Sequence, residues 1–284
     1  MTLTKLGAAI FAALIGSSLP AKAIDCARAS KRIEKMICGD TKLKAADAAL
    51  NAAYVAFLRS APDRETRDLI IASQRRWLKA RDGEFDAAPD QEAGASDGEP
   101  RDEAAVLLSA IERRKNSITG TTYFPGLAAV IKKQRANAAM YTGGPYAGYQ
   151  TDCWFAPRGF GNGDYLCLGT ETFQNRDRIC RSATSWASGH TTEYRTVADV
   201  VGSGVRLKAT CATGYESTDE PCPEPGLDEG HWNMKPVATG DTPEFTLKGR
   251  EHLQKYDPDA SSMGEPWLRD CLTDPNYPAP GSKK

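Results

Sequence analysis

The chain has 284 residues, of which 36 are Lys or Arg and 37 are Asp or Glu, so its formal net charge is -1 at pH 7. Nucleic-acid binding needs a concentrated basic face, and this balanced composition therefore excludes nucleic acid as an expected partner. A chain of this length exceeds the usual size of one domain, about 100 to 150 residues, and we expect two domains.

Residues 1–23 have the organisation of an export signal. Lys5 gives a positive start, residues 6–15 are apolar, and small residues lead to a cleavage site after Ala23. The apolar run is well short of the roughly twenty residues that span a bilayer. A lipoprotein needs small residues directly before its cysteine, whereas the residue before Cys26 is charged. We therefore expect a soluble periplasmic protein that starts at Ile24, without a lipid anchor or membrane span.

All eight cysteines follow this signal, at Cys26, Cys38, Cys153, Cys167, Cys180, Cys211, Cys222 and Cys271. An even number in an exported chain favours disulfides and an oxidising compartment. The C-terminal six allow many pairings. Cys211 with Cys222 is the easiest local closure, and Cys167 with Cys180 could bridge adjacent strands. That scheme leaves Cys153 with Cys271.

The first two cysteines could be a lipid anchor, a metal or redox pair, or a disulfide. A continuous helix between Cys26 and Cys38 would separate their α-carbons by about 18 Å, whereas a disulfide needs roughly 4.4 to 6.8 Å. The helix therefore cannot run the whole way. With Ser30 as N-cap and Glu34 in the first turn, a short helix of about eight residues that ends near Cys38 could close a small ring.

From Ser30 to about Ser117 the apolar pattern is helical. Buried stripes recur every three to four residues at Leu43, Ala46, Leu50, Tyr54, Phe57 and Leu58, at Leu69, Ile70, Ser73, Trp77 and Ala80, and at Val106, Leu107, Ile111 and Ile118. Ser60 is a candidate N-cap for the second stripe, with Pro62 in the first turn. The stripes predict a small helical bundle.

An acidic segment at 83–102 separates the second and third stripes. It has seven Asp or Glu against one Arg, whereas residues 24–82 have thirteen Lys or Arg against eight Asp or Glu. The segment is rich in Gly, Pro and Ala, so we expect a flexible loop, which could fold over its basic neighbours.

After residue 120 the pattern changes to short β-type runs, at 165–173, 178–186, 191–201 and 205–215. The end of the chain, 274–284, is expected to be disordered. The predicted fold class is α+β: a small disulfide-stapled α-helical bundle at 24–119, followed by a disulfide-rich, mainly β domain at 120–284.

A set of N-terminal residues resembles a known family. The stretches "DC", "EKMIC", "AAD", "QRRWLKARD" and "IERR" contain Asp25, Glu34, Asp47, Tyr54, Gln74, Trp77 and Arg81. Together they are similar to the LprI-like lysozyme-inhibitor family over about 24–117. The resemblance implies a small exported helical domain whose partner is a lysozyme-type glycan hydrolase. The family often has a second cysteine pair, which is absent here, and this implies that Cys26 and Cys38 form the first bridge.

The sequence contains no motif for catalysis or for a cofactor. Zinc sites use close Cys and His clusters, whereas His190, His231 and His252 are isolated. No HExxH, GxSxG, phosphate-binding loop or redox CxxC is present, so we expect no metal, no cofactor and no enzyme. A hydrolase with perturbed carboxylates at 150–270 is the less favoured alternative.

Binding is therefore the expected activity. A lysozyme-type enzyme cleaves between two carboxylates, so an inhibitor that occludes the cleft would offer them donors. Candidate donors on the helical domain are Arg28, Lys31, Arg32 and Lys35, and the acidic segment could steer a cationic lysozyme.

The alternative function is a cell-envelope glycan-binding or scaffolding module that acts through C-terminal aromatic residues. An aromatic platform for sugars could be formed by Trp154, Trp186, Trp232, Trp267, Tyr146, Tyr149 and Tyr165. Core packing is the other interpretation of these residues. Trp77 is expected in the core of the bundle. Gln74, Arg75 and Arg81 flank it, and one of the two arginines is expected to fix this helix to Asp47 or Asp82.

Overall fold

The structure is a computed structural model that describes residues 24–86, 102–122, 125–156, 164–187, 190–214, 221–223, 230–236, 253–260 and 266–278. The helices in this part of the chain are α1 (Arg32–Gly39), α2 (Thr41–Ser60), α3 (Arg64–Asp86), α4 (Glu103–Thr119), α5 (Leu127–Met140) and α6 (Pro266–Thr273). The strands are β1 (Gly148–Phe155), β2 (Tyr165–Asn175), β3 (Arg178–Ala187), β4 (His190–Val201) and β5 (Gly204–Gly214). The predicted α+β class is confirmed. The signal at 1–23 lies outside the described residues.

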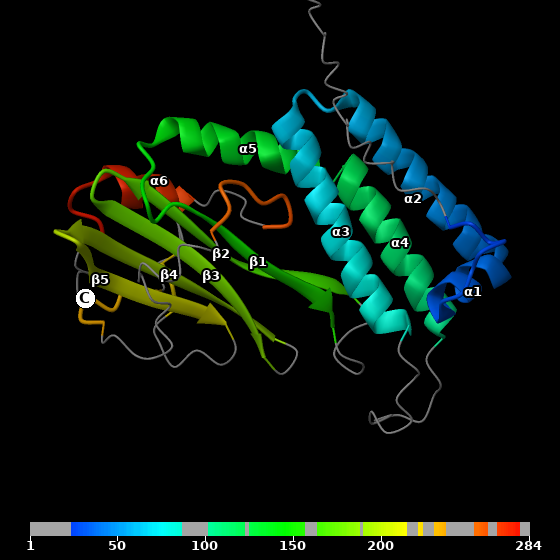
Figure 1. Ribbon diagram of the computed structural model, residues 1–284. Helices are drawn as coiled ribbons and strands as arrows, with labels where there is room; N and C mark the ends of the chain where they lie inside the picture. Colours follow the sequence, from blue (N-terminus) through cyan, green and yellow to red (C-terminus); the bar gives the residue numbers. More distant parts are fainter. Residues whose placement is uncertain are drawn as a thin grey trace, which may run out of the picture.

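Helices α1 to α4 form a bundle beside the sheet (Figure 1). Helix α2 packs against α4, and the short α1 closes the end of the bundle that lies away from the sheet. The bundle core is fully apolar at its centre, where Ile33, Ile70, Trp77, Leu107 and Ile111 are all 0% exposed. The helical stripes are therefore the source of this core, and the predicted burial of Trp77 is confirmed.

Two predicted helix starts are displaced by a few residues. The N-cap of α1 is Lys31 and not Ser30. The Glu34 carboxylate accepts hydrogen bonds from the backbone nitrogens of Lys31 and Ser30, at 3.1 and 2.7 Å, and so ties the residue before the cap to the first turn as well. Ser60 is the last residue of α2 and not a cap. The carboxylate of Asp63 accepts from the backbone nitrogen of Thr66 at 2.7 Å, so α3 begins after Asp63.

Helical structure extends beyond its predicted limits in two places. Helix α3 continues to Asp86, so the first residues of the acidic segment are helical, whereas 87–101 lie outside the described residues. Helix α5 occupies a segment where we expected β-type runs. Its sequence is rich in Ala, the best helix former, but it buries only Leu127, Ile131 and Gln134, which is too few for a clear stripe. Figure 1 shows α5 running from the bundle over the sheet.

The sheet is an antiparallel meander with the strand order β1-β2-β3-β4-β5. The four predicted runs become β2 to β5, whereas β1 was not predicted as a strand. Helix α6 packs on β2 and β3. Residues Phe173, Cys180, Val197, Trp267 and Leu268 belong to the core between the sheet and this helix.

All eight cysteines are paired. The expected bridges Cys26–Cys38 and Cys211–Cys222 are confirmed, with α-carbons 5.5 and 5.0 Å apart. The other two pairings were wrong, because the bonds are Cys153–Cys167 and Cys180–Cys271.

The two errors have one physical cause each. Cys153 lies directly opposite Cys167 in the register of β1 and β2, and that register is invisible unless β1 is recognised. Cys271 lies on α6, which packs on β3 and so reaches Cys180. The pairing therefore follows from the tertiary structure and not from distance along the chain.

The C-terminal segment is also more ordered than expected. Residues 274–278 are described, and the Tyr277 ring packs on Trp232 with centroids 5.7 Å apart. The Tyr277 carbonyl accepts a hydrogen bond from Arg178 at 3.0 Å. The prediction of disorder was wrong for these residues, and 279–284 lie outside the described part. Among the helices that the structure describes, none has the length and apolar character needed to cross a bilayer.

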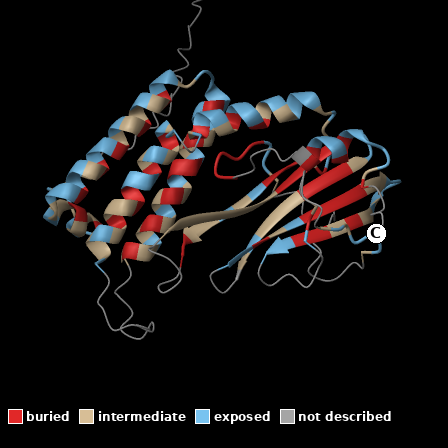
Figure 2. Ribbon diagram, turned by 180° about the vertical axis from the view of Figure 1, so that it is seen from behind, coloured by how far each residue is buried: buried red, intermediate tan, exposed pale blue. Residues whose placement is uncertain are grey.

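Residues 253–260 connect the two parts of the molecule. Gln254 exchanges backbone hydrogen bonds with Tyr149 on β1, both at 2.7 Å. The close approach needs a glycine at position 148, where a Cβ atom would meet the Gln254 carbonyl oxygen at 2.9 Å. Residues 256–260 are all buried, and Figure 2 shows this buried loop between the helices and the sheet. This irregular segment thus forms much of the interface between the helical bundle and the sheet.

Candidate functional site

The residues of the family motif support the bundle from within. Asp47 is 8% exposed, and its carboxylate accepts a hydrogen bond from the backbone nitrogen of Ile24 at 3.2 Å. Arg81 lies 3.9 Å from Asp47, donates to Asp82 at 2.7 Å and covers the Trp77 ring at 5.3 Å. Of the two arginines that flank Trp77 in the sequence, Arg81 is therefore the one that makes the expected contacts. The motif therefore describes how the domain packs rather than what it binds.

The remaining motif residues also have structural contacts. The amide oxygen of Gln74 accepts from Arg114 on α4 at 2.9 Å, and Tyr54 is 5% exposed. Glu34 caps α1, and the backbone N–H groups of Ser30 and Lys31 lower the pKa of this carboxyl. Asp25 is mostly exposed and accepts from the backbone nitrogen of Ala27 at 3.1 Å.

The basic candidates at α1 differ in how they are engaged. Arg32 donates to the Phe85 carbonyl at 2.6 Å and to the Glu103 carboxylate, so it ties α1 to α3 and α4. Lys31 lies 2.9 Å from Asp82, and its side chain is 51% exposed.

Arg28 and Lys35 are the more available pair. Arg28 is 88% exposed and lies 3.6 Å from Asp25. Lys35 is exposed, and its side chain has no hydrogen bond or ion pair within the described ranges. Of the predicted donors, these two can therefore reach a partner without breaking a contact between helices.

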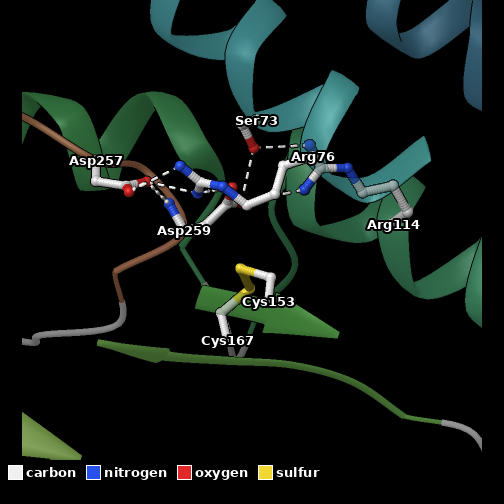
Figure 3. The surroundings of a disulfide bond; sticks show 7 residues. All are labelled: Ser73, Arg76, Arg114, Cys153, Cys167, Asp257 and Asp259. Atoms are coloured by element: carbon white, nitrogen blue, oxygen red, sulfur yellow. Dashed lines mark hydrogen bonds and ion pairs between the residues drawn. A yellow bond between two sulfur atoms is a disulfide. The ribbon is translucent and has the colours of Figure 1, made fainter. Parts of the chain in front are cut away.

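A second charged cluster lies where the bundle meets the sheet (Figure 3). We define the junction cluster as Arg76 on α3, Arg114 on α4, and Asp257 and Asp259 in the connecting segment. The two terminal guanidinium nitrogens of Arg76, Nη1 and Nη2, donate to Asp257 at 3.0 Å, and Nη1 also donates to Asp259 at 2.6 Å. The two cations balance the two carboxylates.

Neighbouring polar side chains complete the junction cluster. Ser73 donates its hydroxyl to Asp259 at 2.7 Å and accepts from Arg114 at 2.8 Å. Arg114 also lies 3.3 Å from Asp259. Gln134 on α5 exchanges hydrogen bonds with the backbone of Asp257 at 2.7 and 3.0 Å.

The electrostatics of the junction cluster favour a structural role. Burial lowers the pKa of Arg76, but the hydrogen bond and the charge of Asp257 outweigh it, so this pKa lies above its ordinary value. Both oxygens of each carboxylate accept from donors of the protein. Carboxylates held in this way are suited to joining helices α3 and α4 to the sheet and not to acid–base catalysis.

A pocket of about 650 Å³ adjoins the junction cluster. We call it the junction pocket. Its lining is drawn from α3, α4, α5, β2 and the connecting segment: Trp77, Ala110, Arg113, Arg114, Ser117, Pro125, Leu127, Ala129, Val130, Lys133, Tyr165, Cys167, Pro258, Asp259 and Ala260. Bridge Cys153–Cys167 lies below the cluster in Figure 3, on the strand side of this pocket.

The C-terminal aromatic residues do not gather at one exposed surface. Tyr146, Tyr149 and Trp267 are at most 5% exposed. Trp232 packs against the core that contains Trp267, with ring centroids 6.1 Å apart, and Tyr165 packs against the bundle core. Trp154 and Trp186 are half-buried on β1 and β3. The core-packing interpretation is confirmed for the three buried rings.

The histidines give no metal centre in the described part of the chain. No group of three or more His, Cys, Asp or Glu side chains in these ranges could hold a metal ion. His190 and His231 lie in the described part, whereas His252 lies outside it.

These observations define the class of the N-terminal part: a small helical domain closed by one disulfide, with exposed basic groups at its free end. Residues 26–117 match the family described as lysozyme inhibitor LprI. This region is therefore an LprI-type domain, as the resemblance predicted. No curated protein and no solved structure matches the chain.

Sequence reasoning missed most of the junction cluster. Arg76 and Arg114 lie inside the motif stretches "QRRW" and "IERR". Two arginines beside buried positions were therefore a signal that carboxylate partners exist elsewhere in the chain. Asp257 and Asp259 lie in "YDPDA", where no periodic pattern marks them. They are more than 140 residues from the arginines along the chain, at separations such as 181 and 145.

Proposed function

We propose that the protein is exported to the periplasm and inhibits lysozyme-type glycan hydrolases without being an enzyme itself. The observation that carries this proposal is the match of residues 26–117 to lysozyme inhibitor LprI. The inhibitor binds over the active-site cleft and offers cationic donors to the two catalytic carboxylates. Its target is therefore recognised by an acidic cleft.

The end of the bundle at α1 is the best surface for this contact. It lies away from the sheet, so a bulky enzyme can approach it (Figure 1). Bridge Cys26–Cys38 holds α1 in place, and Ile33 and Ile37 anchor it with exposures of 0 and 1%. Arg28 and Lys35 supply exposed cations there. Lys31 adds a third cation when it exchanges Asp82 for a carboxylate of the partner.

Export with cleavage after Ala23 has support from the start of the described chain. The backbone nitrogen of Ile24 donates to the Asp47 carboxylate, whose side chain is 11% exposed. Cleavage would replace this amide N–H by an ammonium group, which forms a stronger, charge-assisted hydrogen bond. The contact thus suits a chain that begins at Ile24.

Lysis of cell walls by lysozyme provides the test. The purified protein should slow lysis with saturable, one-to-one inhibition. Changing both Arg28→Glu and Lys35→Glu should weaken it by about tenfold or more, because two favourable charges become repulsive. Lys132→Glu on α5 has the same type of change at an exposed position away from α1 and should leave inhibition intact.

The outcomes separate the function from its surface. An unchanged rate of lysis at a large molar excess of the wild-type protein would refute the proposed inhibitor function. Inhibition that persists in the Arg28 and Lys35 double variant would keep the function but move the contact elsewhere on the molecule.

A further inference from the structure

The junction pocket has the size and lining of a small-molecule site. Ligand pockets typically measure about 300 to 1,000 Å³ and are mostly apolar with a few polar groups. The volume here, about 650 Å³, lies within that range. Ala110, Leu127, Val130 and Pro258 give the apolar lining, and helices, sheet and connecting segment all contribute to it. The walls come from several rigid elements, as is usual for a preformed site.

The charges at the junction pocket favour an anion. Three cations, Arg113, Arg114 and Lys133, line it, against the single carboxylate of Asp259. Arg114 is engaged in the junction cluster, and Arg113 lies 2.5 Å from Asp164. Lys133 is exposed on α5 and has no hydrogen bond or ion pair within the part of the chain that is described. Since both arginines already have carboxylate partners, Lys133 is the one lining cation among the described residues that is available to a ligand, and it suits a ligand with one anionic group.

Two lining residues also carry buried polar hydrogens without an acceptor. Among the residues that the structure describes, the indole nitrogen of Trp77 and the hydroxyl of Tyr165 have no hydrogen-bond partner. Such groups are rare in folded proteins, and each one calls for an explanation. Burial raises the pKa of Tyr165 above its ordinary value, so this hydroxyl keeps its proton at neutral pH and acts as a donor. A ligand with an acceptor, together with a small adjustment of these rings, would satisfy them.

We propose that the junction pocket binds a small carboxylic acid with an apolar body. The carboxylate lies between Lys133 and the donors of Trp77 and Tyr165, and the apolar body packs between α4, α5 and β2. A phosphate ester is disfavoured, because its higher charge would need several free cations. This site is separate from the α1 surface and goes beyond the proposed inhibitor function.

Calorimetric titration with sodium decanoate, below its micelle concentration, tests the proposal on the purified protein. We expect saturable binding of one decanoate per chain. Decyltrimethylammonium has the same apolar chain and the opposite charge, and it should bind at least about tenfold more weakly, since it meets Lys133 as a like charge. Equal affinity for the two, or no binding of decanoate up to millimolar concentration, would overturn the proposal.

Variants locate the binding. Lys133→Gln should weaken decanoate binding by about fivefold, the effect expected for one partly exposed charge-assisted contact. Lys132→Gln is the matched control, because Lys132 is exposed on the same helix but does not line the pocket. Val130→Trp fills the pocket from its half-buried edge and should abolish binding while the circular dichroism spectrum stays unchanged. Decanoate affinity that survives in Val130→Trp would place the ligand elsewhere and refute the site.

Discussion

Helix α3 takes part in two groups of ion pairs that have similar chemistry and very different burial. In the junction cluster, the side chains of Arg114, Asp257 and Asp259 are 2, 0 and 3% exposed. At the α1 end, the side chains of Lys31 and Asp82 are 51 and 29% exposed. Water screens the second group and not the first, so the energetic consequences of breaking them differ.

The contrast assigns different roles to the two groups. A buried pair that loses one partner leaves an uncompensated charge in a medium of low dielectric constant, so the junction cluster has to stay intact. An exposed pair exchanges its partner for water or for a foreign carboxylate at little cost. The α1 end is therefore suited to the contact proposed above, whereas the junction cluster holds the bundle on the sheet.

The largest expected effect comes from breaking the junction cluster. Asp259→Asn keeps the shape of the side chain but removes the charge that faces Arg76 and Arg114. We expect a loss of about 3 to 5 kcal/mol in the free energy of unfolding, measured by denaturation with the disulfides intact. Asp270→Asn is the control, because this exposed carboxylate pairs only with its neighbour Arg269 in the described structure. A loss below about 1 kcal/mol in Asp259→Asn would contradict the comparison.

Two disulfides of nearly equal loop length allow a sharper version of the comparison. Cys26–Cys38 closes a separation of 12 residues and Cys211–Cys222 one of 11. The chain-entropy account predicts that replacing either pair by serine costs about 2 to 3 kcal/mol. Only the loss of Cys26–Cys38 should also weaken the proposed inhibition of lysozyme, because of these two bridges it is the one that holds α1. Equal loss of inhibition in both double variants would show that the α1 end is not the binding surface.

The parts of the fold that the sequence predicted are those with a periodic pattern. Helices α2, α3 and α4 were visible as apolar stripes. The spacing of the first two cysteines excluded a continuous helix between them and allowed a short helix such as α1. Helix α5 was not predicted because it buries only Leu127, Ile131 and Gln134, which are too few for a clear apolar stripe. Strand β1 was not predicted either, and without its register Cys153 was paired with the wrong cysteine.

The functional residues were less predictable than the fold. The motif identified the family because residues such as Trp77 and Arg81 determine its packing, and packing leaves a regular pattern in a sequence. The junction pocket depends on Asp259 and Pro258, which lie in an irregular segment far along the chain from α3 and α4. No local rule relates such segments, because only the complete tertiary structure brings them together.

A smaller effect is expected at Ile24, the first residue of the chain after the proposed cleavage. A protein whose first residue is Ile24 should be about 1 to 2 kcal/mol more stable than one with an extra glycine before it, because an ammonium group then faces Asp47. The carboxylate favours the charged amine, so the gain is complete below about pH 8 and is lost as pH rises and the amine loses its proton. Asp47→Asn should abolish the difference between the two chains. A difference that persists in Asp47→Asn would rule out this ion pair.

The smallest effect concerns acid and the exposed pairs at α1. Burial raises the pKa of Asp82, but hydrogen bonds from Arg81 and Lys31 outweigh it, so this pKa lies below its ordinary value. The folded state therefore binds this proton less readily than the unfolded state. The resulting stabilisation is complete above about pH 4 and is lost as pH falls through the lower pKa of the folded state. The free energy of unfolding, measured from about pH 5 to about pH 2, should decline less steeply with acid in Asp82→Asn than in the wild type. An unchanged slope would mean that the α1 pairs do not contribute to acid sensitivity, and that even this modest electrostatic coupling between α1 and α3 is absent.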